Sequence, residues 1–243
     1  MLKAVFFDLD GTLLPMNEEE FTNAYFKYLC SIDACKKYDK EELIKVIWNG
    51  TKLMYQNDGS KSNEEVFWDY FQENFGKESL CDKEKFDKFY ENEFKKTKEL
   101  CKDNPLAREI VQFAKENVRY VILTTNPIFP RVATITRMGF VDLKLEDFDF
   151  VSTYENSRFC KPNPNYFQEI LDMYSLNPDE VILFGNNDIE DYLCASKVGI
   201  TCYLTGNLIE HKEKGIEFPF VKMEEIIDII KKEIQKRTEG VIL

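Results

Sequence analysis

Runs of consecutive apolar residues recur along the chain, and each run ends in small or polar residues. Five such runs are present, at 4–7, 120–123, 148–151, 181–184 and 200–204. Continuous apolarity is typical of strands that are covered on both faces, as in a parallel sheet. The pattern therefore predicts a buried parallel sheet of five strands.

Segments with helical periodicity lie between the later runs. At 104–105 and again at 163–164, an Asn that can cap a helix precedes a Pro suited to its first turn, and apolar residues at helical spacing follow. Gly139 and Gly199 follow such segments and predict that helices end there. Strands that alternate with helices over 104–206, after a first strand at the start of the sequence, are typical of an α/β protein with a Rossmann-like core.

Residues 16–100 interrupt this alternation, because they contain no convincing strand and show the spacing of several amphipathic helices. Aromatic residues gather on two of the expected helix faces. The first face holds Phe21, Tyr25, Phe26, Tyr28 and Leu29, and the second holds Phe86, Phe89, Tyr90 and Phe94. We interpret both faces as the core of a small helical domain, with contact between a few of these residues and a substrate as the alternative. The sequence thus predicts an all-helical cap at 16–100, inserted into a core formed by 1–15 and 101–243, and a further helix around 223–232.

The charge balance narrows the possible partners. The 243 residues include 32 Lys and Arg against 44 Asp and Glu, a formal net charge of −12, and this acidity argues against binding to nucleic acid. No segment approaches the roughly 18 consecutive apolar residues of a membrane span, and Asp8 follows the first apolar run too soon for a signal peptide. The seven cysteines form no C-x-x-C pair, so we expect free thiols and a cytoplasmic protein.

The strongest chemical signal follows the first apolar run. Asp8 and Asp10 are two positions apart, which places them on one side of an extended chain, at the strand end where open α/β sheets bind ligands. Gly11 then permits a sharp turn in which the backbone can approach an anion. Two carboxylates about 4 Å apart repel each other by about 4 kcal/mol at an effective dielectric of 20. A divalent cation removes that repulsion, so the pair predicts a metal site.

Three further elements follow this D-x-D-G-T motif in order. They are Thr125 after the second core strand, Lys161 before a proline, and the acidic loop at 185–191. Together with the motif at 8–12, they resemble the haloacid dehalogenase (HAD) superfamily of phosphohydrolases. The resemblance implies a HAD-like core with an inserted helical cap. It also implies Mg²⁺-dependent hydrolysis of a small phosphorylated metabolite, a phosphomonoester, through an aspartyl-phosphate intermediate.

The resemblance also gives each matched residue a role. Asp8 takes the position of the nucleophile and Asp10 that of the general acid and base. An ordinary Asp has a pKa near 3.9, so we expect Asp8 to be ionised at neutral pH and to attack without a base. The expected catalytic residues are Asp8, Asp10, Thr125 and Lys161. The expected substrate-binding residues are Gly11, Thr12, Thr125, Asn126 and Lys161. The expected Mg²⁺ ligands are Asp8, Asp10 through its backbone carbonyl, Asn186 and Asp191.

One position departs from the family pattern. The family usually has an Asp directly after the glycine of the last motif, where this chain has Asn186. An amide oxygen can bind Mg²⁺ but brings no charge, so Asp191 becomes the main carboxylate of the loop and the site should bind metal less tightly. Asp188 and Glu190 are acidic neighbours whose roles the sequence does not separate. The presence of Asp10, which true dehalogenases lack, favours phosphate chemistry.

Two alternative functions stay open. A phosphomutase of the β-phosphoglucomutase type would share these catalytic residues, and a non-catalytic binding or regulatory protein is consistent with Asn186. We interpret Arg131 and Arg137 as residues on a helix surface, with binding of an anionic substrate as the alternative. His211 is the only histidine, and no strand-end serine motif accompanies it. The substrate, the cap residues that select it and the oligomeric state are not determined by the sequence.

Overall fold

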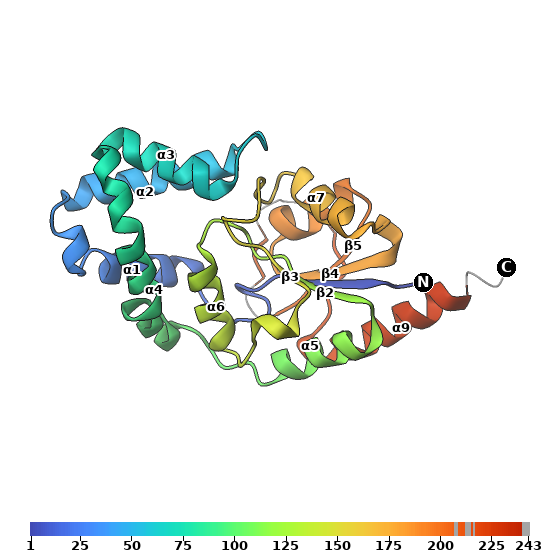
Figure 1. The fold of residues 1–243 in the computed structure, drawn as a ribbon. Helices are drawn as coiled ribbons and strands as arrows, with labels where there is room; N and C mark the ends of the chain where they lie inside the picture. Colours follow the sequence, from blue (N-terminus) through green and yellow to red (C-terminus); the bar gives the residue numbers. More distant parts are fainter. Residues whose placement is uncertain (207–208, 212–214, 216, 240–243) are drawn as a thin grey trace.

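The computed structural model describes residues 1–206, 209–211, 215 and 217–239. Its centre is a parallel sheet whose described strands run in the order β3-β2-β1-β4-β5 (Figure 1). The strands are β1 (Ala4–Phe7), β2 (Tyr120–Leu123), β3 (Phe150–Val151), β4 (Val181–Gly185) and β5 (Thr201–Leu204). The predicted parallel sheet is therefore confirmed. Strand β3 is shorter than the apolar run at 148–151, because Phe148 ends a one-turn helix, Leu145–Asp147.

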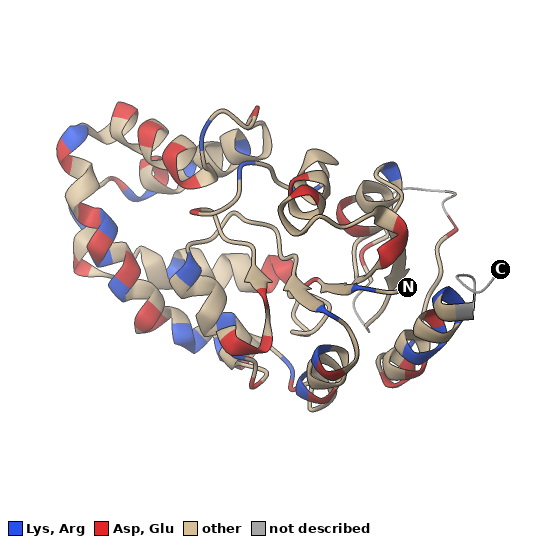
Figure 2. Cartoon of the chain, turned by 45° about the vertical axis from the view of Figure 1, so that its right-hand side comes forward, with Lys and Arg blue, Asp and Glu red and all other residues tan. Residues whose placement is uncertain are grey.

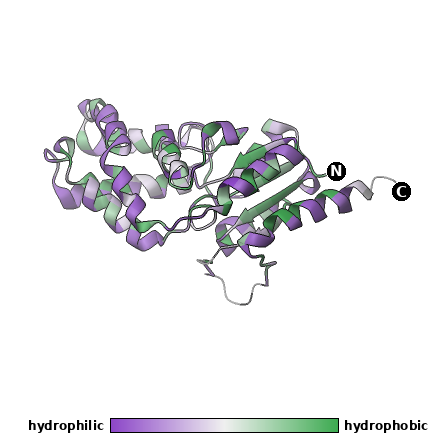
Figure 3. Cartoon of the chain, turned by 90° about the horizontal axis from the view of Figure 1, so that it is seen from below, coloured by the Kyte–Doolittle hydropathy of each residue, from purple (hydrophilic) through white to green (hydrophobic). Residues whose placement is uncertain are grey.

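Helices cover both faces of the sheet. Val5 and Phe7 of β1 belong to one buried cluster and Ala4 and Phe6 to another, so alternate residues of the strand pack against opposite layers. The first layer contains α5 (Leu106–Asn117) and α9 (Ile226–Glu239), and the second contains α7 (Asn165–Tyr174) and α8 (Cys194–Lys197). Figure 3 shows hydrophobic strands beside helices that carry both hydrophilic and hydrophobic residues. This double coverage explains why the strands are continuously apolar.

Four helices between β1 and β2 form a group at one end of the molecule, coloured blue to green in Figure 1. They are α1 (Glu18–Leu29), α2 (Lys40–Tyr55), α3 (Asn63–Phe75) and α4 (Lys83–Glu91). None of the residues 16–100, all of which are described, belongs to the sheet, so the expected helices are confirmed. The chain enters and leaves this group side by side, because Met16 and Cys101 form an isolated bridge. The exact bounds of a separate domain at 16–100 stay a prediction.

The two Asn-Pro pairs behave differently. The N-cap position of α7 is Pro164, but the side-chain oxygen of Asn163 accepts a hydrogen bond from the N–H of Asn165, the first residue of α7, at 3.0 Å. Asn104 does not cap α5, and its side-chain amide instead donates to the carbonyl of Leu13 at 2.9 Å. Asn104 therefore ties the start of α5 to the turn that follows β1.

Both predicted helix ends are confirmed, but only one of the two glycines takes the left-handed conformation. Gly199 has a φ of +85° and ends α8, as expected. Gly139 is the last residue of α6 (Arg131–Gly139), and the left-handed residue beyond this helix is Asp142, with a φ of 57°. Asp tolerates this conformation better than most residues, which lets the turn extend past the glycine.

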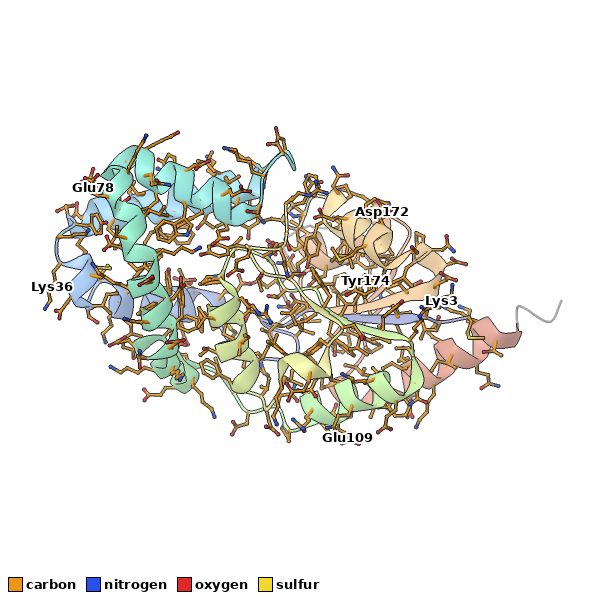
Figure 4. All side chains as sticks on the ribbon, in the orientation of Figure 1. Lys3, Lys36, Glu78, Glu109, Asp172 and Tyr174 are labelled. Atoms are coloured by element: carbon orange, nitrogen blue, oxygen red, sulfur yellow. The ribbon has the colours of Figure 1, made fainter. Side chains whose placement is uncertain are left out.

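Charged residues of both signs are mixed along the helices of both parts of the molecule (Figure 2). Lys36 and Glu78 mark the outer end of the helical group, whereas Lys3, Glu109 and Asp172 lie around the sheet and its helices at the other end (Figure 4). Among the residues that the structure describes, every helix is too short or too polar to cross a membrane.

Candidate active site

The ends of three adjacent strands bring the candidate residues together. Phe7 pairs with Leu123 of β2 and with Phe184 of β4, so the three strands end at one edge of the sheet. Asp8 continues β1, and its N–H donates to the carbonyl of Phe184 at 2.9 Å. The residues that follow β1, β2 and β4 therefore converge at the edge where α/β sheets bind ligands.

Asp8 is only 5% exposed, and both of its carboxylate oxygens have partners. Oδ1 accepts a hydrogen bond from Lys161 Nζ at 2.9 Å, and Oδ2 accepts one from Thr12 Oγ1 at 2.9 Å. Burial raises the pKa of Asp8 to about 7 against the opposing charge of Lys161, and the charges of Asp191 and Asp10 add to the rise. Burial thus opposes the ionisation that the sequence analysis expects of Asp8, whereas the Lys161 ammonium favours it.

Lys161 forms ion pairs with two carboxylates, Asp8 directly after β1 and Asp191 in the loop after β4. It is 1% exposed, and its Nζ donates to Asp8 Oδ1 at 2.9 Å and to Asp191 Oδ1 at 2.6 Å. Burial alone would lower the pKa of Lys161, but Asp191 and Asp8 outweigh it and hold the pKa well above its ordinary value. Lys161 is thus a buried cation between the two predicted carboxylate ligands.

The loop after β4 holds Asp191 in place. Asp191 Oδ2 accepts hydrogen bonds from the N–H groups of Asn186 and Asn187, both at 3.0 Å. A Cβ atom at Gly185 would lie 2.4 Å from the Asp191 carboxyl group, so only glycine fits at this strand end. The loop continues into a π-helical turn, η6 (Asp188–Leu193), that presents Asp191 to Lys161.

Asn186 and Gly11 are in direct contact across the site. A Cβ atom at Gly11 would lie 2.1 Å from the Asn186 side-chain nitrogen, and Gly11 has a φ of +80°. Thr12 Oγ1 lies 3.4 Å from Asn186 Oδ1 as well as 2.9 Å from Asp8 Oδ2. The turn after β1 and the loop after β4 therefore meet at Asn186, beside the nucleophile position.

Asn126 connects the end of β2 to the helical cap. Its Nδ2 donates to Glu190 Oε2 at 2.9 Å and to the hydroxyl of Tyr55 at 3.1 Å. Thr125 is 1% exposed and lines the same cavity. Tyr55, at the end of α2, is a site residue that the sequence analysis missed, because no motif distinguishes it from the other aromatic residues of the cap.

The interpretation of Arg137 as a helix-surface residue is wrong. Its side chain is 2% exposed, it forms an ion pair with Asp10, and its guanidinium lies 4.5 Å from the centre of the Phe129 ring. The physical reason is that α6 turns this face toward the end of β1, where a buried carboxylate and an aromatic ring receive the cation. Arg131, on the same helix, is exposed as expected.

Asp188 and Glu190, the two acidic neighbours of Asp191, lie in different surroundings. Asp188 is fully buried and pairs with His211, whose Nδ1 lies 2.7 Å from Asp188 Oδ2. Glu190 instead lines the cavity and contacts Asn126 and Tyr55. Glu190 is thus the acidic neighbour that can meet a ligand.

A metal site here depends on more than acidic side chains. In the part of the chain that the structure describes, no group of three or more His, Cys, Asp or Glu side chains is arranged to hold a metal. Mg²⁺ would therefore need the Asn186 amide oxygen and the Asp10 carbonyl beside the carboxylates of Asp8 and Asp191, and all four are the oxygen donors that it prefers. The donor set fits a cation, because Asp8 and Asp191 are both buried carboxylates and share the single ammonium group of Lys161.

A cavity of about 260 Å³ connects these residues to the cap. Asp8, Asp10, Thr125, Asn126, Lys161, Asn186 and Asp191 all line it. The opposite walls come from the cap and include residues of both predicted aromatic faces, such as Tyr25 and Tyr90. The cap aromatics are therefore not only a domain core, since several of them border the cavity.

The family model of the haloacid dehalogenase-like hydrolases matches residues 5–205, a range that contains every candidate site residue. The chain belongs to this family. The resemblance drawn from the motifs is thereby confirmed, as is the α/β fold with a HAD-like core.

Individual members of the haloacid dehalogenase-like hydrolases are distant from this chain. Pyrophosphatase PpaX from Bacillus cereus (strain G9842) is 24% identical over 187 residues, which are 76% of this chain and 75% of that protein. Haloacid dehalogenase-like hydrolase domain-containing protein 3 from Danio rerio is 26% identical over 95 residues, and the match spans only 39% of that protein. The crystal structure of a HAD phosphatase from Thermococcus onnurineus has 18% identity and a TM-score of 0.60, over 94% of this chain and 98% of that one. The structural likeness supports the fold.

Proposed function

We propose that this hydrolase is a Mg²⁺-dependent phosphatase that cleaves a small phosphomonoester through an aspartyl-phosphate intermediate. The observation that carries the proposal is the position of Asp8, buried at the end of β1 between Lys161 and Thr12 and open to the cavity. A carboxylate held in one orientation beside a buried cation suits attack on an anionic phosphoryl group.

The proposed reaction has two steps. In the first, an Asp8 oxygen bonds to phosphorus while the bond from phosphorus to the alcohol oxygen breaks, and Asp10 gives its proton to the leaving alkoxide. In the second, water attacks the phosphorus, gives a proton back to Asp10 and releases phosphate from Asp8. Asp10 must carry a proton in the first step, when Arg137 would orient it as a hydrogen-bond donor to the carboxyl group. After Asp10 has given up this proton, Arg137 would pair with the carboxylate until water returns a proton to it.

The remaining residues stabilise charge. Lys161 and Thr125, with the backbone N–H groups directly after Asp8, would bind the oxygens of the phosphoryl group, and Asn126 would help to position it. The N–H groups of Gly11 and Thr12, which the sequence analysis expected to bind substrate, instead donate to the carbonyls of Leu14 and Leu9. When bound by Asp8, the Asp10 carbonyl, Asn186 and Asp191, Mg²⁺ would offset the repulsion between the attacking carboxylate and the phosphate.

We also propose that residues 16–100 act as a lid. Tyr55 of the cap contacts Asn126 and Glu190 of the core, so the cap reaches the groups beside the nucleophile. A lid in this position excludes bulk water during phosphoryl transfer. All seven cysteines are free thiols, which supports the proposed cytoplasmic location, and the net charge of −12 supports a small-molecule partner over nucleic acid.

A second candidate substrate is inorganic pyrophosphate. The similarity to pyrophosphatase PpaX favours it, and attack by Asp8 would release phosphate in the same way. The mutase alternative differs by returning the phosphoryl group to a second hydroxyl of the substrate. The non-catalytic alternative predicts no affinity for Mg²⁺ at Asn186 and its neighbours.

Phosphate release by the purified full-length chain tests the proposal. We expect turnover of at least one phosphomonoester in a panel of phosphorylated metabolites that includes pyrophosphate, dependent on added Mg²⁺. Asp8→Asn should lower kcat by about 10⁴-fold or more, because the nucleophile is lost. Asp172→Asn, an exposed change far from the site, is the matched control and should keep full activity.

Other results would contradict the proposal. Equal activity of Asp8→Asn and Asp172→Asn would exclude Asp8 as the nucleophile. An isomerised sugar phosphate without free phosphate would identify a mutase. A protein that releases no phosphate and shows no heat of Mg²⁺ binding at millimolar concentration would be a binding or regulatory protein.

A further inference from the structure

The side chains that line the cavity differ between its two ends. Its floor, at the strand ends, carries the charged groups of the site, whereas its cap walls are mostly aromatic. Six of the aromatic lining residues come from all four cap helices: Phe21, Tyr25, Phe26, Trp48, Trp68 and Phe86. A phosphomonoester whose phosphate reaches Asp8 would therefore place its alcohol part among rings.

Several polar atoms of the aromatic lining residues already have hydrogen-bond partners. The hydroxyl groups of Tyr25 and Tyr90 are 3.1 Å apart and bond to each other. Trp68 Nε1 donates to the hydroxyl of Tyr154 at 3.2 Å. The cap walls therefore offer mainly ring faces and edges, with only a few polar side chains such as Thr22 and Thr51 among them. A ligand hydroxyl that meets a ring instead of a hydrogen-bond partner binds unfavourably.

The rings of the cap walls already pack against one another in pairs. Phe26 and Trp48 have centroids 5.5 Å apart, and Trp68 and Phe86 have centroids 5.9 Å apart. These spacings fall within the range in which aromatic pairs attract each other. An apolar ring between such walls would gain both burial and ring contacts.

The charged lining residues and the volume of the cavity further limit which ligands it can bind. The carboxyl groups of Glu18, Asp87 and Glu190 border the cavity, and the buried cation Arg137 is paired with Asp10. A second anionic group on the ligand would meet like charges. The volume of about 260 Å³ is below that of a typical drug-sized pocket, so it suits one or two rings.

We propose that this site selects phosphomonoesters whose alcohol carries an uncharged apolar ring. The inference rests on the proposed function, and it names the substrate class that the cap would recognise. It distinguishes this site from one built for sugar phosphates, which would need mostly polar cap walls, and from one built for pyrophosphate, which would need cations that the described cap lining does not contain.

The test compares benzyl phosphate, glycerol 1-phosphate and pyrophosphate with the full-length chain and Mg²⁺. Benzyl phosphate and glycerol 1-phosphate both release a primary alcohol, so they differ mainly in the group that the cap contacts. We expect kcat/KM for benzyl phosphate to exceed that of the other two by about 100-fold. Equal or better turnover of glycerol 1-phosphate or pyrophosphate would overturn the inference and leave the phosphatase proposal intact.

A binding measurement separates the two proposals if turnover is absent. Benzylphosphonate cannot be hydrolysed and should bind about 100-fold more tightly than 2,3-dihydroxypropylphosphonate by calorimetry. Selective binding without turnover would support the inference and contradict the proposed function. Equal binding of both phosphonates would overturn the inference.

A variant pair tests the cap walls directly. Trp48 lines the cavity yet is 51% exposed, so Trp48→Ala should not unfold the cap, and Leu80, at 46% exposed, lies in the cap outside the cavity. Trp48→Ala should lower the preference for benzyl phosphate over glycerol 1-phosphate about 10-fold, mainly through KM, whereas Leu80→Ala should leave it unchanged. The same preference in both variants would contradict a role for the ring walls.

Discussion

The two ends of the cavity are lined by different kinds of side chain, charged at the strand ends and aromatic on the cap side. At the strand ends, Asp8 and Asp191 are buried with Lys161 as their cation, and the half-buried Asp10 pairs with Arg137. On the cap side, aromatic rings pack against each other and pair their polar atoms among themselves. In the proposed function the difference separates two tasks, because charge would stabilise the transferred phosphoryl group whereas ring surface would discriminate among alcohols.

The two ends also contribute differently to stability. Burying charges is costly, and an ion pair inside a protein roughly compensates that cost rather than adding much stability. Apolar ring burial stabilises the fold directly, by about 25 cal/mol for each Å² removed from water. We therefore expect single changes in the charged end to be severe, and single changes at the partly exposed ring wall to be mild.

The largest effect should come from Lys161→Met. The change leaves Asp8 and Asp191 buried together without their shared cation, so the free energy of unfolding should fall by about 3–5 kcal/mol. Denaturant unfolding without Mg²⁺ measures it. Lys3→Met is the control, because Lys3 is 40% exposed in its pair with Glu180 and should lose at most about 1 kcal/mol. Similar losses in both variants would show that Lys161 does not compensate the site.

Next in size is Arg137→Gln, which removes the cation paired with Asp10. We expect kcat to fall about 100-fold while KM changes little, because Arg137 acts through Asp10 rather than on the substrate. Steady-state kinetics measures both constants. The exposed Arg131 of the same helix provides the matched variant, Arg131→Gln, which should keep the kcat of the unchanged chain. A rise in KM with normal kcat would instead make Arg137 a substrate-binding residue.

A change within the cap should affect stability but not chemistry. Asp82 is buried and pairs with Lys37 and Lys85, and it accepts a hydrogen bond from Tyr38. Burial would raise its pKa, but these hydrogen bonds outweigh burial and hold the pKa below its ordinary value. Asp82→Asn should therefore cost about 2 kcal/mol of unfolding free energy at neutral pH.

The stabilisation that the Asp82 charge provides depends on pH. Because the pKa of Asp82 is lower in the folded chain, its contribution is present above the unfolded value of about 3.9 and is lost as the pH falls through the folded value. Unfolding curves between pH 6 and pH 3 should show the difference between Asp82→Asn and the unchanged chain shrinking toward acid. A difference that stays constant with pH would mean that packing, not charge, is lost.

The smallest effect should come from Asn186→Asp, which adds a carboxylate of nearly the same shape to the proposed metal site. We expect Mg²⁺ to bind about 10-fold more tightly, because the added negative charge attracts the cation. The Asp side chain has nearly the shape of the Asn side chain, so it fits in the same place beside Gly11 and Thr12. Calorimetry, or the Mg²⁺ concentration for half-maximal activity, measures the change. Asn117→Asp, on an exposed helix end, adds the same charge elsewhere and should leave the Mg²⁺ requirement unchanged. An unchanged requirement in Asn186→Asp would place Asn186 outside the metal site.

The sequence by itself determined the sheet, the helical insertion and the strand-end motif. Each of these depends on local spacing: continuous apolar runs define buried strands, and Asp8 and Asp10 lie on one side of an extended segment whatever the rest of the chain does. The convergence of Lys161 and Asp191 could be anticipated because parallel strands end at a common edge.

Only the tertiary structure decided which distant residues complete the site. Arg137 lies 127 positions from Asp10, and Tyr55 lies 135 positions from Glu190, so no local pattern marks either contact. An arginine on a helix has the same sequence signature whether it faces solvent or a buried carboxylate. The same holds for the cap aromatics, because helical spacing shows which residues share a face but not whether that face meets another helix or a cavity.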